Sequence, residues 1–278
     1  MKFNDNKILV TGGAGYIGSH IVEILVRKKF NVVILDNLST GNKKLINTKA
    51  KFIKGDIQNF EQLRNLIKSE NIKTIIHLAA SLNISEAEKK KKKYYENNVN
   101  GTFNVIKSCY KSSVRNLIFS SSCSIYGPVK GKVSENKRPN PISYYAKTKL
   151  IGEKLIIKNS KKYNYKYGIL RYFNVAGASR SGRIGEIESS HGHLIKNISI
   201  QSLKKNPKIN IFGKNHKTKD GTCIRDYIHV SDLAEIHFKI LKYLMNNKDS
   251  LTLNCGYGKG YSVLEKIGRA HVRTPVTA

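Results

Sequence analysis

Residues 8–19, ILVTGGAGYIGS, constrain the fold more than any other stretch, because they join an apolar strand, a glycine-rich turn and the start of a helix. Gly12, Gly15 and Gly18 recur at three-residue intervals. In such a turn glycine permits a positive φ, lets a pyrophosphate approach the bare backbone and lets the helix pack closely on the strand. The first N–H groups of the helix then face a bound anion. The stretch predicts a dinucleotide site; the alternative is a tight turn that holds no ligand.

An acidic residue follows the next predicted strand. This apolar run, residues 31–35, ends at Asp36, which lies 24 residues after Gly12. At this spacing an acid meets the adenosine ribose hydroxyls of a dinucleotide. Its negative charge repels a 2′-phosphate, so the sequence favours NAD over NADP.

Apolar runs alternate with helical patterns up to residue 119. This alternation predicts an α/β fold with a doubly wound parallel Rossmann sheet, since right-handed crossovers leave few other topologies. We expect an NAD-binding domain over residues 1–173, completed by later segments, and a smaller, incomplete C-terminal substrate lobe over 174–267. Residues 251–255 are expected to form a strand of that lobe, and Ser231 is expected to cap the helix before it.

Other candidate residues follow the predicted strands, at the edge of the sheet where ligands bind. Asp56 and Ile57 come after the third apolar run and are expected to flank the adenine. The alternative is that Asp56 is an acid at the start of the next helix, residues 60–69. Ala79 and Ala80, after the fourth run, are small enough for a cofactor to lie against the backbone.

The reacting groups are expected beside the fifth strand, residues 116–119, which is followed by three serines ending at Ser122. Tyr145 comes 23 residues later, and Lys149 four residues after that. Residues i and i+4 share a helix face, so the Lys149 ammonium is expected near the Tyr145 phenol. A nearby cation, together with the positive nicotinamide, lowers the pKa of a phenol from its ordinary value of about 10. Tyr145 is therefore a candidate general base.

The Tyr-Lys spacing alone is weak support. Three tyrosines have a cation four residues on, about as many as chance gives in so basic a chain. Tyr126 is followed by Gly-Pro, which breaks a helix. Tyr167 lies in a strand pattern, where its cation, Arg171, would be about 13 Å away. Only the context of Tyr145, a helix-like stretch with a serine at a neighbouring strand end, suits a base.

The charge balance is strongly basic, with 50 Lys+Arg against 19 Asp+Glu and a formal net charge of +31. Such a field attracts polyanions, for example nucleic acid or an anionic membrane. The lysines are scattered through every segment, which favours compositional drift over a specific nucleic-acid site. Five consecutive lysines at 89–93 are expected to cover an exposed loop or helix face, and a polyanion site is the alternative.

The four cysteines, Cys109, Cys123, Cys223 and Cys255, are widely spaced. Neither a metal site nor a disulfide framework is predicted, and a reducing compartment is favoured. No apolar run approaches the roughly 18 residues of a membrane span, and the first residues carry no apolar signal core. We expect a cytoplasmic protein without a membrane partner.

Taken together, these motifs resemble the extended short-chain dehydrogenase/reductases, and among them the UDP-glucose (UDP-galactose) 4-epimerases. Dehydratases of the superfamily place acids after the strand-five hydroxyl, where this chain has Cys123 and Ser124. The resemblance therefore implies epimerisation and not dehydration. It covers about 265 residues and is carried by the segments VTGGAGYIGSH, LDNLSTG, IIHLAA, YYENNVNGT, FSSSCSIYG, SYYAKTKL, LRYFN, GTCIRDYIHVSDLA and GYGKGYSVLE.

The resemblance also implies a role for each matching residue. Ser122 and Tyr145 would bind the sugar 4-hydroxyl, and Lys149 the nicotinamide ribose. Arg225 would pair with the phosphates, and Phe212 would stack on the uracil, with core packing as the alternative for Phe212. The NAD site would comprise Gly12, Gly15, Tyr16, Ile17, Gly18, Asp36, Asn37, Asp56, Ile57, Leu78, Ala79, Ala80, Asn97, Tyr145 and Lys149. The UDP-sugar site would comprise Ser122, Tyr145, Asn174, His193, Leu194, Phe212 and Arg225.

The implied reaction begins when Tyr145 takes the proton of the 4-hydroxyl as hydride passes from C4 to NAD⁺. The 4-keto sugar then turns over, and hydride returns to its opposite face. The uridine diphosphate stays anchored while the hexose rotates. The resemblance further implies a homodimer formed by helices near residues 97–112 and 145–160.

Several positions depart from the family pattern. Leu82 lies near where many relatives carry a lysine that contacts the cofactor, and His193 lies in a loop where asparagine is common. His77 and His229 are expected to be core strand residues without a catalytic role.

The last residues depart further. Residues 266–278, KIGRAHVRTPVTA, lose the helical pattern and resemble no family segment, so 268–278 are expected to be a non-native tail. The substrate lobe would then lack contacts, and turnover would be poor. Two alternatives stay open: an epimerase of N-acetylated or uronic UDP-sugars, and an inactive NAD-binding or polyanion-binding fragment.

Overall fold

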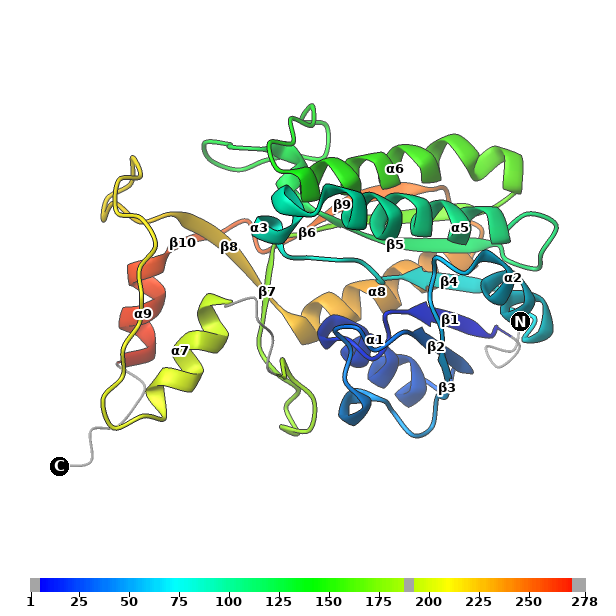
Figure 1. The fold of residues 1–278 in the computed structure, drawn as a ribbon, viewed down its shortest axis with the longest axis horizontal. Helices are drawn as coiled ribbons and strands as arrows, with labels where there is room; N and C mark the ends of the chain where they lie inside the picture. Colours follow the sequence, from blue (N-terminus) through cyan, green and yellow to red (C-terminus); the bar gives the residue numbers. More distant parts are fainter. Residues whose placement is uncertain (1–5, 188–192, 272–278) are drawn as a thin grey trace.

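The computed structural model describes residues 6–187 and 193–271, and its largest feature is a seven-stranded sheet (Figure 1). The strands lie in the order β3-β2-β1-β4-β5-β6-β9, and each pairs with its neighbours in parallel. This arrangement confirms the expected doubly wound parallel Rossmann sheet. The strands are β1 (Ile8–Thr11), β2 (Val32–Asp36), β3 (Lys51–Lys54), β4 (Thr74–His77), β5 (Asn116–Ser122), β6 (Lys166–Tyr172) and β9 (Leu251–Cys255).

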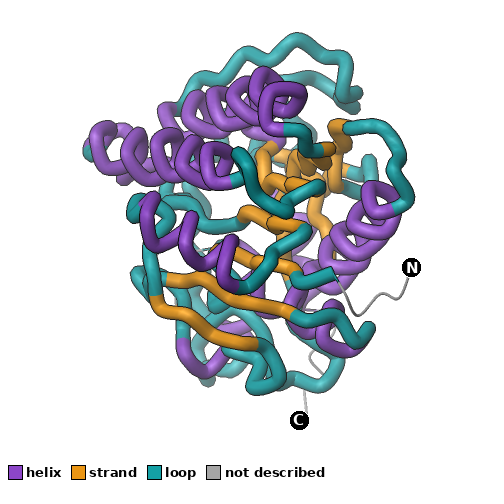
Figure 2. Tube along the Cα trace, turned by 90° about the vertical axis from the view of Figure 1, so that its right-hand side faces the viewer, coloured by secondary structure: helices purple, strands orange, loops and turns teal. Residues whose placement is uncertain are grey.

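Helices cover both faces of this sheet, as Figure 2 shows. Helices α2, α5 and α6 enclose one apolar cluster against the sheet, and α1 and α8 enclose another on the opposite face. Strands such as β1 are buried along their whole length, which is why they read as unbroken apolar runs. The five helices are α1 (Tyr16–Arg27), α2 (Phe60–Ser69), α5 (Gly101–Ser108), α6 (Tyr144–Tyr163) and α8 (Val230–Met245).

Helix α6 lies close to β5 and begins beside the end of that strand. Ser143 caps its first turn by accepting a hydrogen bond from the Ala146 N–H at 3.2 Å. Gly152 lets the helix approach the sheet, since a Cβ at this position would lie 2.9 Å from the Phe119 ring. The buried face of α6 is unusual because it carries ionisable side chains, among them Lys149 and Glu153.

Short elements connect the layers, and two of them carry the run of five lysines. The predicted exposure of that run is confirmed. Residues 89–93 lie in or beside two short helices, and all five lysines are exposed. These connecting elements are η2 (Lys43–Leu45), α3 (Ile84–Lys89), α4 (Lys91–Tyr94), the π-helix η3 (Tyr95–Asn100) and η4 (Cys123–Tyr126).

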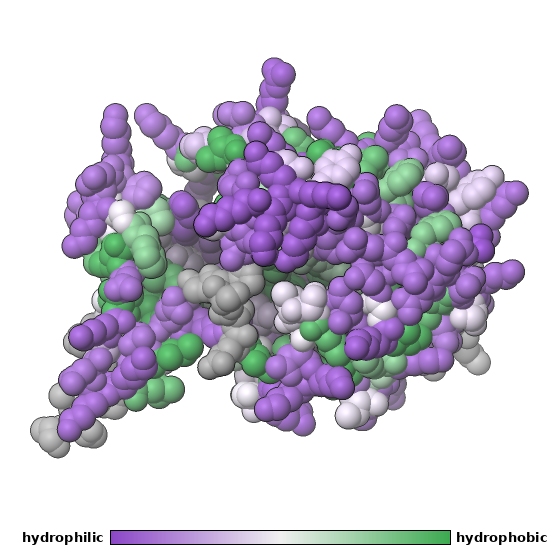
Figure 3. All heavy atoms as spheres, viewed as in Figure 1, coloured by the Kyte–Doolittle hydropathy of each residue, from purple (hydrophilic) through white to green (hydrophobic). Residues whose placement is uncertain are grey.

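A smaller lobe carries a three-stranded sheet of order β10-β8-β7, with two helices beside it. Figure 3 shows hydrophilic groups over most of the visible face and apolar groups gathered at the end formed by this lobe. Exposed apolar side chains of the lobe include Leu203, Phe212 and Ile224. The elements are β7 (Asn174–Ala176), α7 (Leu194–Ser202), β8 (Ile224–His229), β10 (Gly260–Ser262) and α9 (Val263–His271).

Three expectations about this part of the chain are wrong. Residues 251–255 form β9, which pairs with β6 at the edge of the large sheet and is not a strand of the smaller lobe. His229, and not Ser231, caps α8, because its side chain accepts a hydrogen bond from the Ser231 N–H at 3.2 Å. His229 is also exposed and not part of the core.

Helix α9 continues through the segment expected to lose its helical pattern, up to His271. Residues 272–278 of the predicted tail lie outside the described residues. Across the described ranges, the structure contains no helix with the length and apolar character needed to span a membrane.

Candidate active site

The glycine-rich turn lies at the point where the strand order reverses, between β1 and β4. The chain runs outward from β1 to β2 and β3 and then returns to β4 on the other side. Gly12 follows β1 with a φ of +74°, and a Cβ on it would lie 2.8 Å from the Ala79 nitrogen. A crevice at such a switch point is where open α/β sheets bind nucleotides. The requirement for glycine at position 12 is therefore conformational and steric.

The start of α1 closes the other side of this turn. A Cβ on Gly18 would lie 2.2 Å from the Gly12 carbonyl oxygen, so only glycine lets the helix pack on the turn. Gly15 occupies the N-cap position without a side-chain cap, and the N–H groups of Tyr16 and Ile17 begin the helix. Anions bind well at such a helix end. The predicted geometry of the turn and helix is confirmed.

A buried histidine ties β1 to β4 beneath the turn. Thr102 Oγ1 donates to the Asn98 carbonyl at 2.6 Å and therefore accepts from His77 Nε2 at 3.0 Å. His77 Nδ1 in turn accepts from Thr11 Oγ1 at 2.7 Å. Burial lowers the pKa of His77 to about 3, so this imidazole stays neutral. The expectation that His77 is a core residue is confirmed. Its bonds to Thr11 and Thr102 hold the end of β4 beside the end of β1, where Gly12 follows.

Asp36 lies at the end of β2 and is fixed by backbone donors. One carboxylate oxygen accepts from the Ala14 N–H at 3.0 Å and the other from the Leu38 N–H at 2.8 Å. Burial raises the pKa of Asp36, while these two N–H groups lower it. The side chain thus presents negative charge beside the glycine-rich turn, as the sequence predicted.

Asn37 and Asp56 lie next to each other, although they follow different strands. The Asn37 amide donates to Asp56 Oδ2 at 2.8 Å, and Asp56 Oδ1 accepts from the Gln58 N–H at 2.8 Å. Asn59 caps α2, so the alternative role of Asp56 at the start of that helix is wrong. Ile57 packs in the apolar cluster beneath. These contacts place Asn37 and Asp56 on one side of the switch point.

The loop after β4 is held by two asparagines of the π-helix η3. Asn98 accepts from the Ser81 N–H at 2.8 Å and donates to Thr148 Oγ1 of α6 at 3.1 Å. Asn97, which the sequence singled out, donates to Ser81 Oγ at 3.2 Å. Leu78 and Ala80 of the same loop are half-buried, whereas Leu82 is exposed. Asn98, which the sequence did not single out, fixes the distance between this loop and α6.

Ser122 and Tyr145 meet at the end of β5. Ser122 is the last residue of that strand, and its Oγ accepts from Ser124 Oγ at 2.9 Å. Tyr145 is buried in the first turn of α6, and the nearby Ser122 hydroxyl lowers the pKa of the phenol. Burial has the larger effect and raises that pKa above its ordinary value. The expected lowering of the Tyr145 pKa included the charge of the nicotinamide, so it stays a prediction.

Lys149 lies one turn after Tyr145 on α6, as predicted, but its ammonium has a different neighbour. The Nζ atom donates to the Ser120 carbonyl at 2.8 Å and lies 5.0 Å from the centre of the Phe119 ring. Burial lowers the pKa of Lys149 to about 7, and the Glu153 carboxylate raises it against that effect. The ammonium thus lies against β5, and the expectation that it would perturb the phenol directly is wrong.

The residues expected to bind the sugar nucleotide lie on the smaller lobe. The Asn174 amide, on β7, donates to the Asp226 carbonyl of β8 at 3.0 Å. Arg225 of β8 is exposed. The Phe212 side chain is 88% exposed, so its alternative role in core packing is wrong. His193 precedes α7, which begins at Leu194, and its Nδ1 lies 2.5 Å from Glu186 Oε1.

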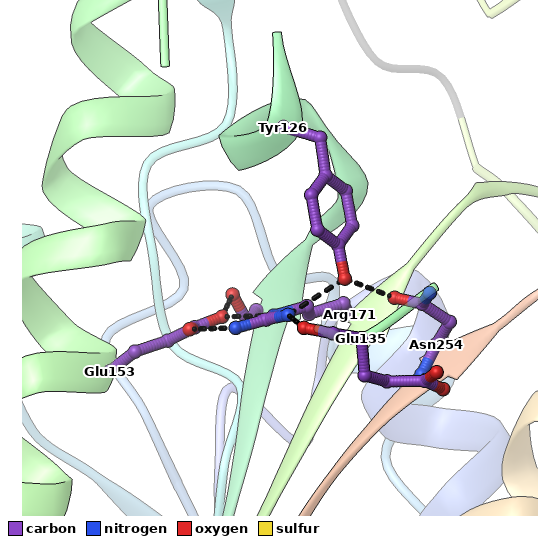
Figure 4. Close-up of polar contacts among 6 residues, drawn as sticks. Tyr126, Glu135, Glu153, Arg171 and Asn254 are labelled. Carbon is purple, nitrogen blue, oxygen red and sulfur yellow. Dashed lines mark hydrogen bonds and ion pairs between the residues drawn. The ribbon is translucent and has the colours of Figure 1, made fainter. Parts of the chain in front are cut away.

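A buried ion pair beside the site was not anticipated (Figure 4). Arg171 Nε and Nη2 bind the two oxygens of Glu153 at 3.1 and 2.8 Å. Arg171 Nη1 donates to Tyr126 at 2.7 Å and to the Glu135 carbonyl at 3.0 Å, and the Tyr126 hydroxyl donates to Asn254 at 2.8 Å. The signal was present in the sequence, because Glu153 continues the four-residue spacing of Tyr145 and Lys149.

Comparison with known proteins matches residues 8–256 to the model of the NAD dependent epimerase/dehydratase family. A UDP-glucose 4-epimerase from Lactobacillus helveticus is 43% identical over 260 residues, which are 93% of this chain and 79% of that protein.

Solved structures give the same result. A UDP-glucose 4-epimerase from Brucella ovis in complex with NAD superposes with a TM-score of 0.90 at 38% identity, over 95% of this chain and 81% of the other. A UDP-Glc/GlcNAc 4-epimerase from Campylobacter jejuni superposes with a TM-score of 0.81 at 39% identity, over 95% and 82% of the two chains.

Proposed function

This chain belongs to the NAD dependent epimerase/dehydratase family, and on that premise we propose that it is an NAD-dependent 4-epimerase of UDP-hexoses, which interconverts UDP-glucose and UDP-galactose. The observation that carries this proposal is that Ser122 ends β5 and the buried Tyr145 begins α6, which lies against that strand, on the same sheet edge as the glycine-rich turn. A dinucleotide bound along that edge has its adenosine end near Asp36 and its other end near β5.

The residues of the turn fit NAD. A Cβ at position 12 or 18 would clash with neighbouring backbone atoms, so the glycines keep the tight turn and helix end at which a pyrophosphate binds. Asp36 is fixed with its charge beside the turn, which suits ribose hydroxyls and repels a 2′-phosphate. We propose that Asn37, Asp56, Ile57, Leu78, Ala79, Ala80 and Asn97 complete the site, with Tyr145 and Lys149 at the nicotinamide end.

NAD, when bound, supplies the acceptor and donor of hydride at C4 of the sugar. Tyr145 takes the proton of the 4-hydroxyl and returns it, and Ser122, at the end of β5, orients that hydroxyl by a hydrogen bond. Because burial raises the pKa of Tyr145, the phenolate forms only when positive charge enters the site. The positive nicotinamide is that charge, and the Lys149 ammonium, held against β5, is placed to bind the nicotinamide ribose.

We propose that Asn174, His193, Leu194, Phe212 and Arg225 bind the uridine diphosphate and the sugar. A guanidinium matches the geometry of phosphate oxygens, and the exposed Phe212 ring is free to stack on a base. Epimerisation of an N-acetylated sugar is the second candidate, because a similar structure is a UDP-Glc/GlcNAc 4-epimerase.

We also propose a homodimer, formed by the helices near residues 97–112 and 145–160. Two large side chains there, Tyr110 and Ile157, are 54% and 45% exposed. Light scattering of the purified protein tests this proposal, and Ile157→Lys is expected to yield a monomer. The four cysteines are free, which suits the reducing cytoplasm that we propose as its compartment.

The function is tested by incubating the protein with UDP-galactose and following UDP-glucose. UDP-N-acetylglucosamine is tested in parallel, because its conversion would extend the substrate range to N-acetylated sugars. Tyr145→Phe is expected to slow the reaction by about 10²–10⁴-fold while NAD stays bound. Equal rates for Tyr145→Phe and the unaltered protein would contradict the proposal. It would also be contradicted if the unaltered protein converted neither sugar.

A further inference from the structure

Three ionisable side chains of α6 lie beside three consecutive serines of β5. Tyr145, Lys149 and Glu153 follow one another at intervals of one helical turn, and all three are buried. Tyr145 lies near Ser122, whose hydroxyl lowers the pKa of the phenol, whereas Lys149 donates to the Ser120 carbonyl and Glu153 accepts from the Ser121 hydroxyl. The same helix face that carries the proposed base and cation therefore ends on a carboxylate.

The Glu153 carboxylate is held in place from two sides. Arg171, which pairs with Ser121 across β5 and β6, binds both of its oxygens. Arg171 itself is fixed by Tyr126 and by the Glu135 carbonyl (Figure 4). Bidentate pairing of this kind allows little movement of the carboxylate. Its negative charge thus has a fixed position one helical turn from Lys149.

We propose that Glu153 is a positioning residue for the reaction, whose fixed carboxylate keeps the Lys149 ammonium charged and held against the end of β5. The inference rests on the proposed function, since it assigns to Lys149 the cation of the nicotinamide end.

The groups around Lys149 support this assignment. The residue is 3% exposed, and burial lowers its pKa to about 7, whereas Glu153 raises it. On β4, His77 is neutral because burial lowers its pKa to about 3. On β6, Arg171 is positive but paired with Glu153, and on α6 the pKa of Tyr145 is raised, so that phenol is neutral too. Glu153 thus provides the negative charge that favours the ammonium, and without it the pKa of Lys149 falls below about 7.

A merely structural ion pair would leave the titration of Lys149 unchanged. The decisive measurement is therefore the titration of Lys149 itself, by NMR of the protein labelled with ¹³C at the lysine ε-carbon. The Lys149 signal is the one that Lys149→Met removes. In Glu153→Gln its midpoint is expected to fall by about one pH unit or more.

The pH profile of turnover provides a second measurement. In Glu153→Gln the alkaline limb of kcat/KM for UDP-galactose is expected to move to lower pH by the same amount, with kcat falling more than KM rises. Glu153→Asp keeps the negative charge, so the midpoint of the Lys149 titration is expected to stay close to that of the unaltered protein.

The matched control is Glu135→Gln, in the same network. Its side chain accepts from the Asn254 N–H at 2.8 Å, so the variant disturbs the network without removing the charge beside Lys149. An unshifted Lys149 midpoint in Glu153→Gln, or an equal shift in Glu135→Gln, would overturn the inference.

If Glu153→Gln does not fold, the double variant Glu153→Gln with Arg171→Met leaves no buried charge unpaired. Glu153 is the charged neighbour that raises the pKa of Lys149, so the midpoint is expected to fall in the double variant as well. An unchanged midpoint there likewise overturns the inference.

The two proposals fail in different ways. If the unaltered protein converts neither sugar, the proposed function fails, while the titration still decides whether Glu153 sets the charge of Lys149. If it converts UDP-galactose and the midpoint does not move in Glu153→Gln, only the role of Glu153 is wrong.

Discussion

Tyr145 and Lys149 lie one turn apart on α6, yet the Lys149 ammonium donates to the Ser120 carbonyl of β5 at 2.8 Å. Burial is therefore the largest influence on the phenol, and it raises the pKa of Tyr145. In the function proposed above, the Tyr145 phenol is therefore protonated until the positive nicotinamide binds beside it.

The first prediction concerns this protonation state. Without NAD, Tyr145 is expected to stay protonated beyond pH 10, and with NAD⁺ bound its titration is expected to move toward neutral pH. The measurement is the tyrosinate absorbance of the unaltered protein minus that of Tyr145→Phe, recorded against pH with and without NAD⁺. Identical difference curves under the two conditions would refute it.

The second prediction concerns the helix that closes the glycine-rich turn. Gly18→Ala is expected to displace the backbone, because its Cβ would lie 2.2 Å from the Gly12 carbonyl oxygen. Loss of a backbone hydrogen bond to the pyrophosphate weakens NAD binding by about tenfold. Calorimetric titration with NAD measures this loss. Gly268→Ala, where a Cβ would meet nothing within 4 Å, is the control and should bind NAD normally.

The third prediction concerns cofactor choice. Asp36→Asn removes the negative charge and keeps only one of the two oxygens that accept from the Ala14 and Leu38 N–H groups. The dissociation constant for NAD is expected to rise about tenfold, and the preference for NAD over NADP is expected to shrink. Titration with both cofactors measures the ratio. Asp249→Asn, a carboxylate whose side chain is 95% exposed, should leave the ratio unchanged.

The fourth prediction concerns stability. Arg171→Met leaves the Glu153 carboxylate buried without its partner, and is expected to lower the free energy of unfolding by about 3–5 kcal/mol. Urea unfolding measures the difference. Arg27→Met breaks the exposed pair with Glu235, whose atoms are 3.4 Å apart, and should cost less than about 1 kcal/mol. Equal losses in the two variants would show that burial of the ion pair is unimportant.

The fifth prediction concerns acid stability. His237 donates from Nδ1 to the Leu233 carbonyl at 2.8 Å and accepts at Nε2 from the Tyr172 hydroxyl at 2.6 Å. Burial lowers its pKa from 6.5 to about 4, so the unfolded chain takes up a proton first as the pH falls. The stability from this group is complete above about pH 6.5 and is lost as the pH falls toward 4.

Between pH 7 and 5, His237→Gln is therefore expected to lose less stability than the unaltered protein, by about 2 kcal/mol. Urea unfolding at the two pH values gives both losses. His216→Gln, at an exposed position, is the control and should follow the unaltered protein. A loss in His237→Gln as large as that of the unaltered protein would contradict the prediction.

Much of the fold could be predicted, because its signals are local. The glycine spacing, the acid after β2 and the serines after β5 each lie within one strand and the turn that follows it. Because the strands pair in parallel, their carboxyl ends lie at one edge of the sheet, and these residues therefore lie there together. The prediction fails where one segment could pair with either of two sheets. β9 has an apolar pattern that suits either sheet, and only the free edge of β6 decides its place.

By itself, the sequence determined which residues could meet a dinucleotide, because backbone conformation at Gly12 and helix packing at Gly18 depend on near neighbours. Only the tertiary structure decided where the Lys149 ammonium points and that Glu153 pairs with Arg171, 18 residues away on another element. A long charged side chain has many rotamers. When it is buried it loses its hydrogen bonds to water, so the rotamer that forms is the one whose protein partners replace those bonds.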